Sequence, residues 1–442
     1  MLDRSRWVLG VTPDDHLVLG GCDLVALATT YGTPLHVVDE QRLRSNYRRF
    51  RAAFETAYPA TRVFYSYKTN CIPGVLRVLH DEGCGAEVIS PYEAWLANRL
   101  GVKGSDTIYN GVARSQADFE MAIHHGIGLI NVDSVDELER LERAAAGRPA
   151  PVNIGLRVYP PVGWRAHFGI DPRRDRLVDR AAALSASAAV RLSALHAHIG
   201  SGVRRTVDYE RLIDTLCALM RDLKARAGIA IDTLDLGGGY GVPTVKVLSM
   251  PELASYKLLS IPPRPPRAEQ CPTIEAFGQT LTATLRDRCA RDGMAEPSLL
   301  LEPGRILTGD AQLLLVTVKE IKARGARTAF AIADGGMQNV AFPLSYEYHH
   351  CFLANRARAP LNRRYVVVGP LCSPQDLLYR NWPFPVLESG DVLAVMDAGA
   401  YFTSFANNFA FPRPAVVGVA DGRHRLLHER ETFEHVAAGA PR

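Results

Sequence analysis

Short apolar runs alternate with longer amphipathic stretches between about residue 60 and residue 305, and no other feature restricts the possible folds as much. The apolar runs predict buried strands, and the apolar residues at helical spacing between them predict helices. Regular strand–helix alternation favours parallel strands. Eight such runs are typical of a closed (β/α)8 barrel, and a doubly wound open sheet is the alternative. The expected strands are 63–67, 86–90, 107–111, 129–134, 153–158, 193–200, 233–238 and 298–304.

The sequence changes character after about residue 305, which indicates a second domain. The chain has 442 residues, more than one ordinary hydrophobic core holds. Strand-like runs with few helical patterns between them make up most of the remainder, so a mainly β domain is expected there. We predict a barrel domain over 38–306 and a β domain formed by 1–37 and 307–442. The proline-rich segment 241–275 is interpreted as an insertion after the seventh strand.

The charge and cysteine patterns argue against several classes of protein. The formal net charge of +4 is small for this length, and no block of lysine and arginine indicates a nucleic-acid or membrane surface. The sequence has no apolar stretch of about 18 residues and no signal-peptide pattern, so a cytoplasmic location is expected. The eight cysteines lack CxxC spacing and the 13 histidines lack an HExxH motif, so we expect free thiols and no metal site.

Polar and charged residues gather where the expected strands end. In a (β/α)8 barrel the carboxyl ends of the strands meet at one face, and this face carries the active site. Purely structural turns would supply mainly Gly, Pro, Ser and Asp. The ends of these strands instead supply an amine, carboxylates, an imidazole and a guanidinium. In chain order the residues are Lys68, Glu87, Asn110, Asp133, Arg157, His198, Gly237–Gly239, and Glu302 with Arg305.

This set of side chains suits pyridoxal phosphate. Lys68 offers the amine that holds the cofactor aldehyde as a Schiff base, and Glu302 offers a carboxylate that keeps the pyridine nitrogen protonated. The glycines 237–239 and Arg305 could bind the phosphate, and His198 could stack on the ring. Each feature alone also has a structural explanation, because a glycine run suits a tight turn and a histidine is often a core residue. Their occurrence together at consecutive strand ends favours the cofactor site.

Separated sequence motifs then point to a known family. The chain resembles the fold-type III pyridoxal-phosphate decarboxylases, the group of diaminopimelate and ornithine decarboxylases, over roughly residues 20–415. The resemblance implies decarboxylation of an amino acid. It also implies a barrel with a C-terminal mainly β domain, as in alanine racemase and ornithine decarboxylase, and a homodimer with shared active sites. The motifs are YSYKTN around Lys68, HAHIGSG (196–202), LDLGGGYG (234–241), EPGR (302–305), DGGM (334–337), GPLCSPQD (369–376) and DAGAY (397–401).

The resemblance also assigns roles to individual residues. Lys68 would form the Schiff base, with the Glu87 carboxylate near it. His198 would stack on the cofactor ring, and Glu302 would contact the ring nitrogen. Cys372 would come from the partner subunit and is the suggested acid that protonates the substrate α carbon after the carboxylate leaves as CO2. The residues implied around the phosphate are Ser201, Gly237, Gly238, Gly239, Arg305 and Tyr401.

Two positions depart from the pattern of diaminopimelate decarboxylases. Those enzymes typically carry an arginine before the proline that follows DGGM, where this chain has Phe342. The residue after the catalytic cysteine is typically glutamate there, or aspartate in ornithine decarboxylases, where this chain has Ser373. This chain thus lacks both charged side chains that would bind the distal group of the substrate. Their absence, together with the C-[ST]-P-x-D form, favours decarboxylases of siderophore and other natural-product pathways. The candidate specificity residues are Phe342, Tyr346, Glu347, His349, His350 and Ser373.

The main expectation is therefore a non-standard, conjugated or carrier-bound amino acid as substrate, with a carrier protein as a further partner. The insertion 241–275 would widen the entrance for such a substrate. Diaminopimelate decarboxylation in lysine biosynthesis is the first alternative. A racemase would need a catalytic tyrosine from the β domain in place of the Cys372 motif. A cofactor-dead regulatory homologue is disfavoured because the expected cofactor residues are all present.

Overall fold

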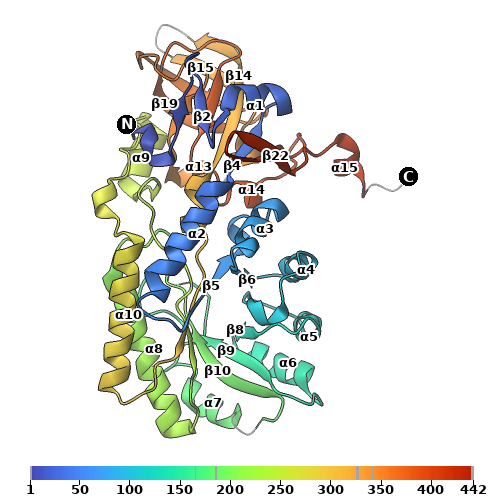
Figure 1. Cartoon of the computed structure of the whole chain (residues 1–442), viewed down its shortest axis with the longest axis vertical. Helices are drawn as coiled ribbons and strands as arrows, with labels where there is room; N and C mark the ends of the chain where they lie inside the picture. Colours follow the sequence, from blue (N-terminus) through green and yellow to red (C-terminus); the bar gives the residue numbers. More distant parts are fainter. Residues whose placement is uncertain (1, 165, 185–186, 325–327, 341–342, 440–442) are drawn as a thin grey trace.

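The structure is a computed structural model, and it describes residues 2–164, 166–184, 187–324, 328–340 and 343–439. Figure 1 shows a barrel in the lower half and a mainly β domain in the upper half. The first helices and strands of the chain lie with the β domain, and the C-terminal end projects to the side. The expected combination of a barrel and a mainly β domain is therefore present.

Eight parallel strands close the barrel in the order β10-β11-β13-β5-β6-β7-β8-β9. Most of their residues are buried on both faces, which explains why the sequence shows continuous apolar runs rather than alternation. All eight strands expected from the sequence are found, so the predicted fold class is confirmed. The strands are β5 (Thr61–Ser66), β6 (Gly85–Val88), β7 (Thr107–Tyr109), β8 (Leu129–Val132), β9 (Val152–Arg157), β10 (Val190–His196), β11 (Thr233–Asp235) and β13 (Ser298–Leu301).

Helices cover the outside of the barrel. Several of these helices begin after a serine, for example Ser90, Ser115 and Ser134. The serine side chain accepts a hydrogen bond from a backbone N–H of the first turn, which has no partner within the helix. The apolar faces of the helices pack against the strands in one continuous core. The helices are α2 (Glu40–Glu55), α3 (Pro73–Asp81), α4 (Pro91–Arg99), α5 (Gln116–His124), α6 (Val135–Ala145), α7 (Leu177–Leu184), α8 (Thr206–Ala227) and α10 (Ile274–Arg291).

The β domain is built around a nine-stranded sheet. Its strand β4 comes from the N-terminal part of the chain and lies between β14, with which it is antiparallel, and β21, with which it is parallel. The strands are β4 (Leu35–Asp39), β14 (Gln312–Arg324), β15 (Thr328–Ala333), β17 (Cys351–Leu353), β18 (Arg363–Val368), β19 (Leu377–Phe384), β20 (Val392–Val395), β21 (Ala415–Ala420) and β22 (Arg423–His428). The predicted limits at residues 37 and 306 stay a prediction.

Smaller elements complete the β domain. A three-stranded sheet precedes β4 and is followed by a short helix. The smaller elements are η1 (Arg4–Trp7), β1 (Gly10–Val11), β2 (Leu17–Leu19), β3 (Cys22–Asp23), α1 (Leu24–Tyr31), α12 (Met337–Val340), α13 (Pro343–Tyr346), β16 (Glu347–Tyr348), α14 (Phe402–Phe405) and α15 (Phe433–Ala437).

The insertion 241–275 connects the two domains. It contains β12 (Lys246–Val247), α9 (Met250–Leu259) and the short helix η4 (Ala268–Gln270). Strand β12 pairs antiparallel with β16 of the β domain. Tyr256 is buried in the core of the β domain, and its hydroxyl accepts a hydrogen bond from the backbone N–H of Arg380 at 2.9 Å. The insertion therefore holds the β domain against the barrel.

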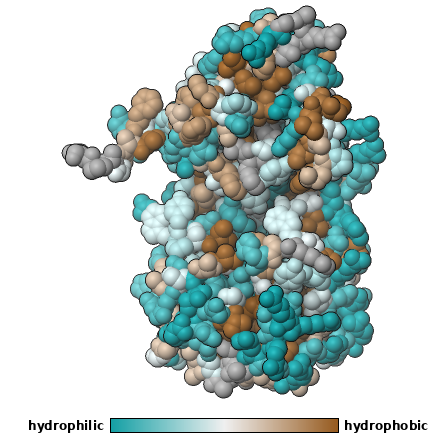
Figure 2. Space-filling model, turned by 180° about the vertical axis from the view of Figure 1, so that it is seen from behind, coloured by the Kyte–Doolittle hydropathy of each residue, from teal (hydrophilic) through white to brown (hydrophobic). Residues whose placement is uncertain are grey.

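The outer surface is mixed in character. Figure 2 shows apolar side chains as separate patches among polar ones, many of them over the β domain in the upper half. Within the described part of the chain, no helix combines the length and apolar character needed to cross a membrane. The eight cysteines are free thiols, and Cys372 is the one that is exposed.

Candidate active site

A cavity of about 290 Å³ opens at the carboxyl ends of the barrel strands. Four of its residues, including the candidate lysine, also line a smaller adjoining cavity of about 60 Å³. The lining of the larger cavity includes Lys68, Glu87, Asn110, Arg157, Trp164, Phe168, His196, His198 and Glu302. The lining of the smaller one includes Lys68, Trp164, His198, Ser201, Gly239, Glu302, Arg305 and Tyr401. Most residues predicted from the strand ends are thus brought together.

Lys68 lies in the short helix η2 (Tyr67–Thr69), directly after β5. Its Nζ donates a hydrogen bond to Glu87 Oε2 at 3.0 Å, and its side chain is 36% exposed toward the cavity. Burial lowers the pKa of Lys68, but the carboxylates of Glu87 and Glu302 outweigh this effect and hold the pKa above its ordinary value. The lysine is therefore an ammonium held by fixed carboxylates, rather than the solvated side chain of a surface turn.

Glu87 is fully buried at the end of β6, and its two oxygens are fixed by neighbours on either side. The hydroxyl of Ser66 and the ammonium of Lys68 donate to Oε2. The amide of Asn110, which follows β7, donates to Oε1 at 2.9 Å. These donors satisfy a buried carboxylate that would otherwise be costly to desolvate.

Glu302 follows β13, the barrel strand that pairs with β5. The same Asn110 amide donates to Glu302 Oε1 at 2.6 Å, so one side chain joins the two carboxylates. The ring of His196 approaches Glu302 Oε2 at 3.6 Å. Burial alone would raise the pKa of Glu302, but His196 and Lys68 hold it well below its ordinary value. Glu302 is therefore an anion beside the cavity.

His198 lies just beyond β10 and presents a neutral ring. Burial and the nearby Lys68 ammonium lower its pKa to about 3. Its Nδ1 accepts a hydrogen bond from the backbone N–H of Gly238 at 3.3 Å. The indole of Trp164 stands edge-on to this ring, with 6.0 Å between the ring centres. His198 can therefore offer a flat apolar face to a ligand but not a charge.

The glycine run after β11 adopts a backbone conformation that residues with a Cβ atom would not fit. Gly237 and Gly239 have φ of +64° and +96°. A Cβ at Gly239 would overlap the carbonyl oxygen of Gly200, and a Cβ at Gly238 would overlap that of Glu302. The run therefore lies tightly against neighbouring backbone at the smaller cavity.

Arg305 is a second cation of the smaller cavity, beside Lys68. Its Nη2 donates to Glu347 Oε1 at 2.7 Å, and its guanidinium lies 5.3 Å from the ring centre of Tyr401. His349 contacts the other oxygen of Glu347 at 3.2 Å. Arg305 Nη1 is buried and has no hydrogen-bond partner among the described residues. A buried guanidinium nitrogen without a partner, beside a tight glycine run, fits the phosphate group of the expected cofactor.

The predicted specificity residues are placed in different surroundings. Glu347 and His349 act on Arg305, whereas His350 hydrogen-bonds the Tyr348 hydroxyl at 2.8 Å and stacks on Trp7 within the β domain. Phe342 lies outside the described residues. Cys372 and Ser373 lie in the loop between β18 and β19 and are absent from the lining of both cavities.

Four residues of the site were not assigned from the sequence. Asp235 and His196 lie inside the motifs that drew attention, but the neighbouring Gly237–Gly239 and His198 were assigned instead. Their signal was present, because both are the last residues of buried strands. Trp164 and Phe168 lie in the loop after β9, which carries no strand or helix pattern that would place them at the cavity.

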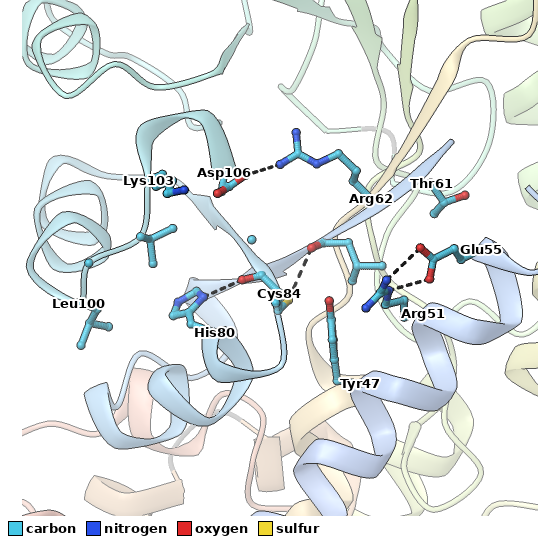
Figure 3. A pocket seen from close by; sticks show the side chains of 15 residues that line it. Tyr47, Arg51, Glu55, Thr61, Arg62, His80, Cys84, Leu100, Lys103 and Asp106 are labelled. Atoms are coloured by element: carbon cyan, nitrogen blue, oxygen red, sulfur yellow. Dashed lines mark hydrogen bonds and ion pairs between the residues drawn. The ribbon is translucent and has the colours of Figure 1, made fainter. Parts of the chain in front are cut away.

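A third cavity, of about 420 Å³, lies at the opposite end of the barrel. Figure 3 shows its lining, which includes Thr61 and other residues near the starts of β5 and β6. Four of its charged side chains pair with one another, Arg51 with Glu55 and Arg62 with Asp106. It lies away from the face where barrel enzymes carry their catalytic groups.

Comparison with known families fits this geometry. Residues 41–309 match the family model described as "Pyridoxal-dependent decarboxylase, pyridoxal binding domain", which is more than half of the chain. The chain belongs to this family. The predicted cofactor, pyridoxal phosphate, and the predicted enzyme class, an amino-acid decarboxylase, are thereby confirmed.

Individual relatives match almost the whole chain. The chain is 34% identical to diaminopimelate decarboxylase of Methanothermobacter thermautotrophicus over 97% of its length and 96% of the relative. It is 32% identical to diaminopimelate decarboxylase of Actinosynnema pretiosum, over 98% and 94%. The crystal structure of M. jannaschii diaminopimelate decarboxylase with L-lysine superposes with a TM-score of 0.87 at 28% identity, covering 98% of this chain and 97% of that one.

These relatives correct the main expectation about the substrate. The expected siderophore or carrier-bound substrate is wrong, because full-length relatives at 28–34% identity are diaminopimelate decarboxylases. The expectation gave too much weight to Phe342 and Ser373. Ser373 lies in the loop between β18 and β19 and does not line the cavities of its own chain.

The glycine run allows a direct test of the cofactor site. Gly239→Ala is expected to weaken pyridoxal phosphate binding by about tenfold or more, since the new Cβ would displace the loop from its neighbours. A fluorescence titration of the cofactor-free protein measures this. Gly228→Ala is the control, because Gly228 also has positive φ but its Cβ would meet no atom within 4 Å. Equal affinity in Gly239→Ala and wild type would contradict the assignment.

Proposed function

We propose that the chain decarboxylates diaminopimelate, with the meso form as the substrate to test first. The observation that carries this proposal is the similarity, along almost the full length of both chains, to curated diaminopimelate decarboxylases. The M. jannaschii relative has been crystallised with L-lysine, which is an amino acid of the same carbon skeleton less one carboxylate. The fold and the cavity are those expected of an amino-acid decarboxylase.

Pyridoxal phosphate, when bound, supplies an aldehyde that condenses with amines and a pyridine ring that accepts electrons. Lys68 would hold the aldehyde, and Glu302 would face the pyridine nitrogen. His198 would cover one face of the ring, which suits its neutral imidazole. The residues proposed to surround the phosphate are Ser201, Gly237, Gly238, Gly239, Arg305 and Tyr401.

Glu87 would accept the proton that the Lys68 ammonium must lose. An amine attacks an aldehyde only in its neutral form, so the Lys68 ammonium must first lose a proton. Glu87 Oε2 lies 3.0 Å from Lys68 Nζ and is the nearest described acceptor for that proton. Its donors Ser66 and Asn110 keep the carboxylate aimed at the lysine throughout.

Cys372 would act in the cavity of a partner subunit. The thiol is exposed, and it is absent from the lining of its own cavity. Exposed aromatic side chains lie on α4 and in the loop after α14. Tyr92, Trp95 and Phe409 are 56%, 51% and 58% exposed. Such a group of exposed aromatic side chains is typical of a surface that binds another subunit. We therefore propose a homodimer in which Cys372 protonates the substrate α carbon across the interface.

Release of CO2 from purified, cofactor-loaded enzyme tests the proposed reaction. We expect kcat/KM for meso-diaminopimelate to exceed the values for ornithine and lysine by at least about a hundredfold, since a site built for a distal carboxylate rejects substrates that lack it. Lys68→Ala is the inactive control. Turnover of ornithine or lysine at a rate equal to that of diaminopimelate would contradict the proposed substrate.

Mixing two inactive variants tests the shared site. Lys68→Ala and Cys372→Ala each damage both sites of a homodimer, but a mixed dimer contains one intact site if Cys372 acts across the interface. Equimolar mixing after subunit exchange should then restore about a quarter of wild-type activity. The same mixing with Lys68→Ala alone is the control. Activity that stays at the level of the separate variants would show that Cys372 does not act in the partner.

A further inference from the structure

Asp235, Glu302 and His196 form a buried cluster beneath the cavity, and the proposed roles above do not use Asp235. The three residues lie on or just after the neighbouring strands β11, β13 and β10. Asp235 is fully buried, and Glu302 and His196 are 4% and 1% exposed. One side-chain oxygen or nitrogen of each residue lies within 4.8 Å of those of the other two. Two almost fully buried carboxyl groups therefore have oxygens within 4.8 Å of each other.

The cluster has too few positive partners for two negative charges. In the described parts of the chain, no lysine or arginine forms an ion pair with either carboxyl group, and the one ionisable contact is His196 with Glu302. Asp235 Oδ1 accepts a hydrogen bond from the backbone N–H of Gly237 at 2.9 Å, and Oδ2 accepts a long one from Asn131 at 3.5 Å. Two adjacent buried carboxylates repel each other strongly unless they share a proton.

The surroundings decide which carboxyl group keeps its proton. Glu302 receives a short hydrogen bond from Asn110, approaches the His196 ring and lies in the field of the Lys68 ammonium. Asp235 has neutral donors alone. The anion is therefore more stable on Glu302. The titratable groups that face the pair are Lys68, Glu87, His196, His198 and Tyr240.

We propose that Asp235 and Glu302 share one proton, which Asp235 carries and donates to Glu302. Asp235 is then a positioning residue that keeps Glu302 anionic and directed into the cavity. The consequence for the cofactor rests on the proposed function, in which Glu302 faces the pyridine nitrogen: a fixed anion there keeps that nitrogen protonated. The location of the proton itself does not depend on that function and can be measured separately.

The pKa directions agree with this geometry. Burial raises the pKa of Asp235 well above its ordinary value, and the adjacent Glu302 raises it further. A group whose pKa is raised by folding stabilises the fold below the unfolded pKa and loses that contribution as the pH rises through the folded pKa. The directions of the two pKa shifts thus favour the proton on Asp235 and the charge on Glu302.

Infrared spectroscopy of the full-length, cofactor-loaded enzyme tests the proton directly. At about pH 8.5 we expect the C=O band of a protonated carboxylic acid, which should shift when aspartate is labelled with carbon-13 and disappear in Asp235→Asn. Asp397, whose pKa burial raises to about 6, is mostly ionised at that pH. Glu93, raised to about 7 by burial, does not respond to aspartate labelling. Absence of the band, or a shift with labelled glutamate alone, would overturn the proposal.

Cofactor affinity of two Asp235 variants provides the second measurement. Asp235→Asn keeps a neutral donor next to Glu302 and should bind pyridoxal phosphate within about threefold of wild type. Asp235→Ala removes the donor and should weaken binding by about tenfold or more. Asp232→Ala, at the exposed residue just before the same strand, is the matched control. Equal loss in the Asn and Ala variants would show that Asp235 acts as a charge, which contradicts the shared proton. A diaminopimelate assay that failed would leave both of these readouts unchanged.

Discussion

The ion pair between the cavity-facing Lys68 and the buried Glu87 is the interaction on which the rest of the site depends. A fully buried carboxylate is stable only with donors around it, and the barrel supplies them from adjacent strand ends. Asn110 extends the same network to Glu302, and His196 and Asp235 continue it below. One connected set of polar side chains thus fixes both the amine and the anion that line the cavity.

The β domain contributes residues that contact the barrel side of the site. Arg305 lies at the end of the barrel sequence, but its guanidinium is held by Glu347 of the β domain, which His349 holds in turn. The backbone N–H of Tyr401 donates to the carbonyl of Thr69, one residue beyond the candidate lysine, at 2.8 Å. The insertion strengthens this junction by pairing β12 with the strand that contains Glu347. Cavity shape therefore depends on how the two domains are docked.

The sequence predicted the barrel well because its strands are buried on both faces and give uninterrupted apolar runs. The strand ends then predicted Lys68, Glu87, His198 and Glu302 as neighbours, and the structure brings them together at one cavity. Pairings between distant segments were not predictable. The contact of Arg305 with Glu347 joins residues 42 positions apart on different domains, and no local pattern marks it.

Other parts of the site escaped prediction for different physical reasons. Asp235 ends a buried strand, but an acidic residue before a glycine run is also common in turns, and the role of Asp235 arises from Glu302 on the next strand. Trp164 lies in an irregular loop whose path the sequence does not specify. The substrate was predicted wrongly because two single-residue departures were weighed above the similarity of the whole chain.

The central claim is that Lys68 is the amine that holds the cofactor, and borohydride reduction of the loaded enzyme tests it most directly. Reduction makes the link between pyridoxal phosphate and its lysine permanent, and mass spectrometry of the digested protein then locates it. The account predicts one modified peptide, with the modification on Lys68. Modification of a different lysine would contradict the assignment of Lys68. The absence of any modified lysine in enzyme loaded with one cofactor per chain would contradict it too.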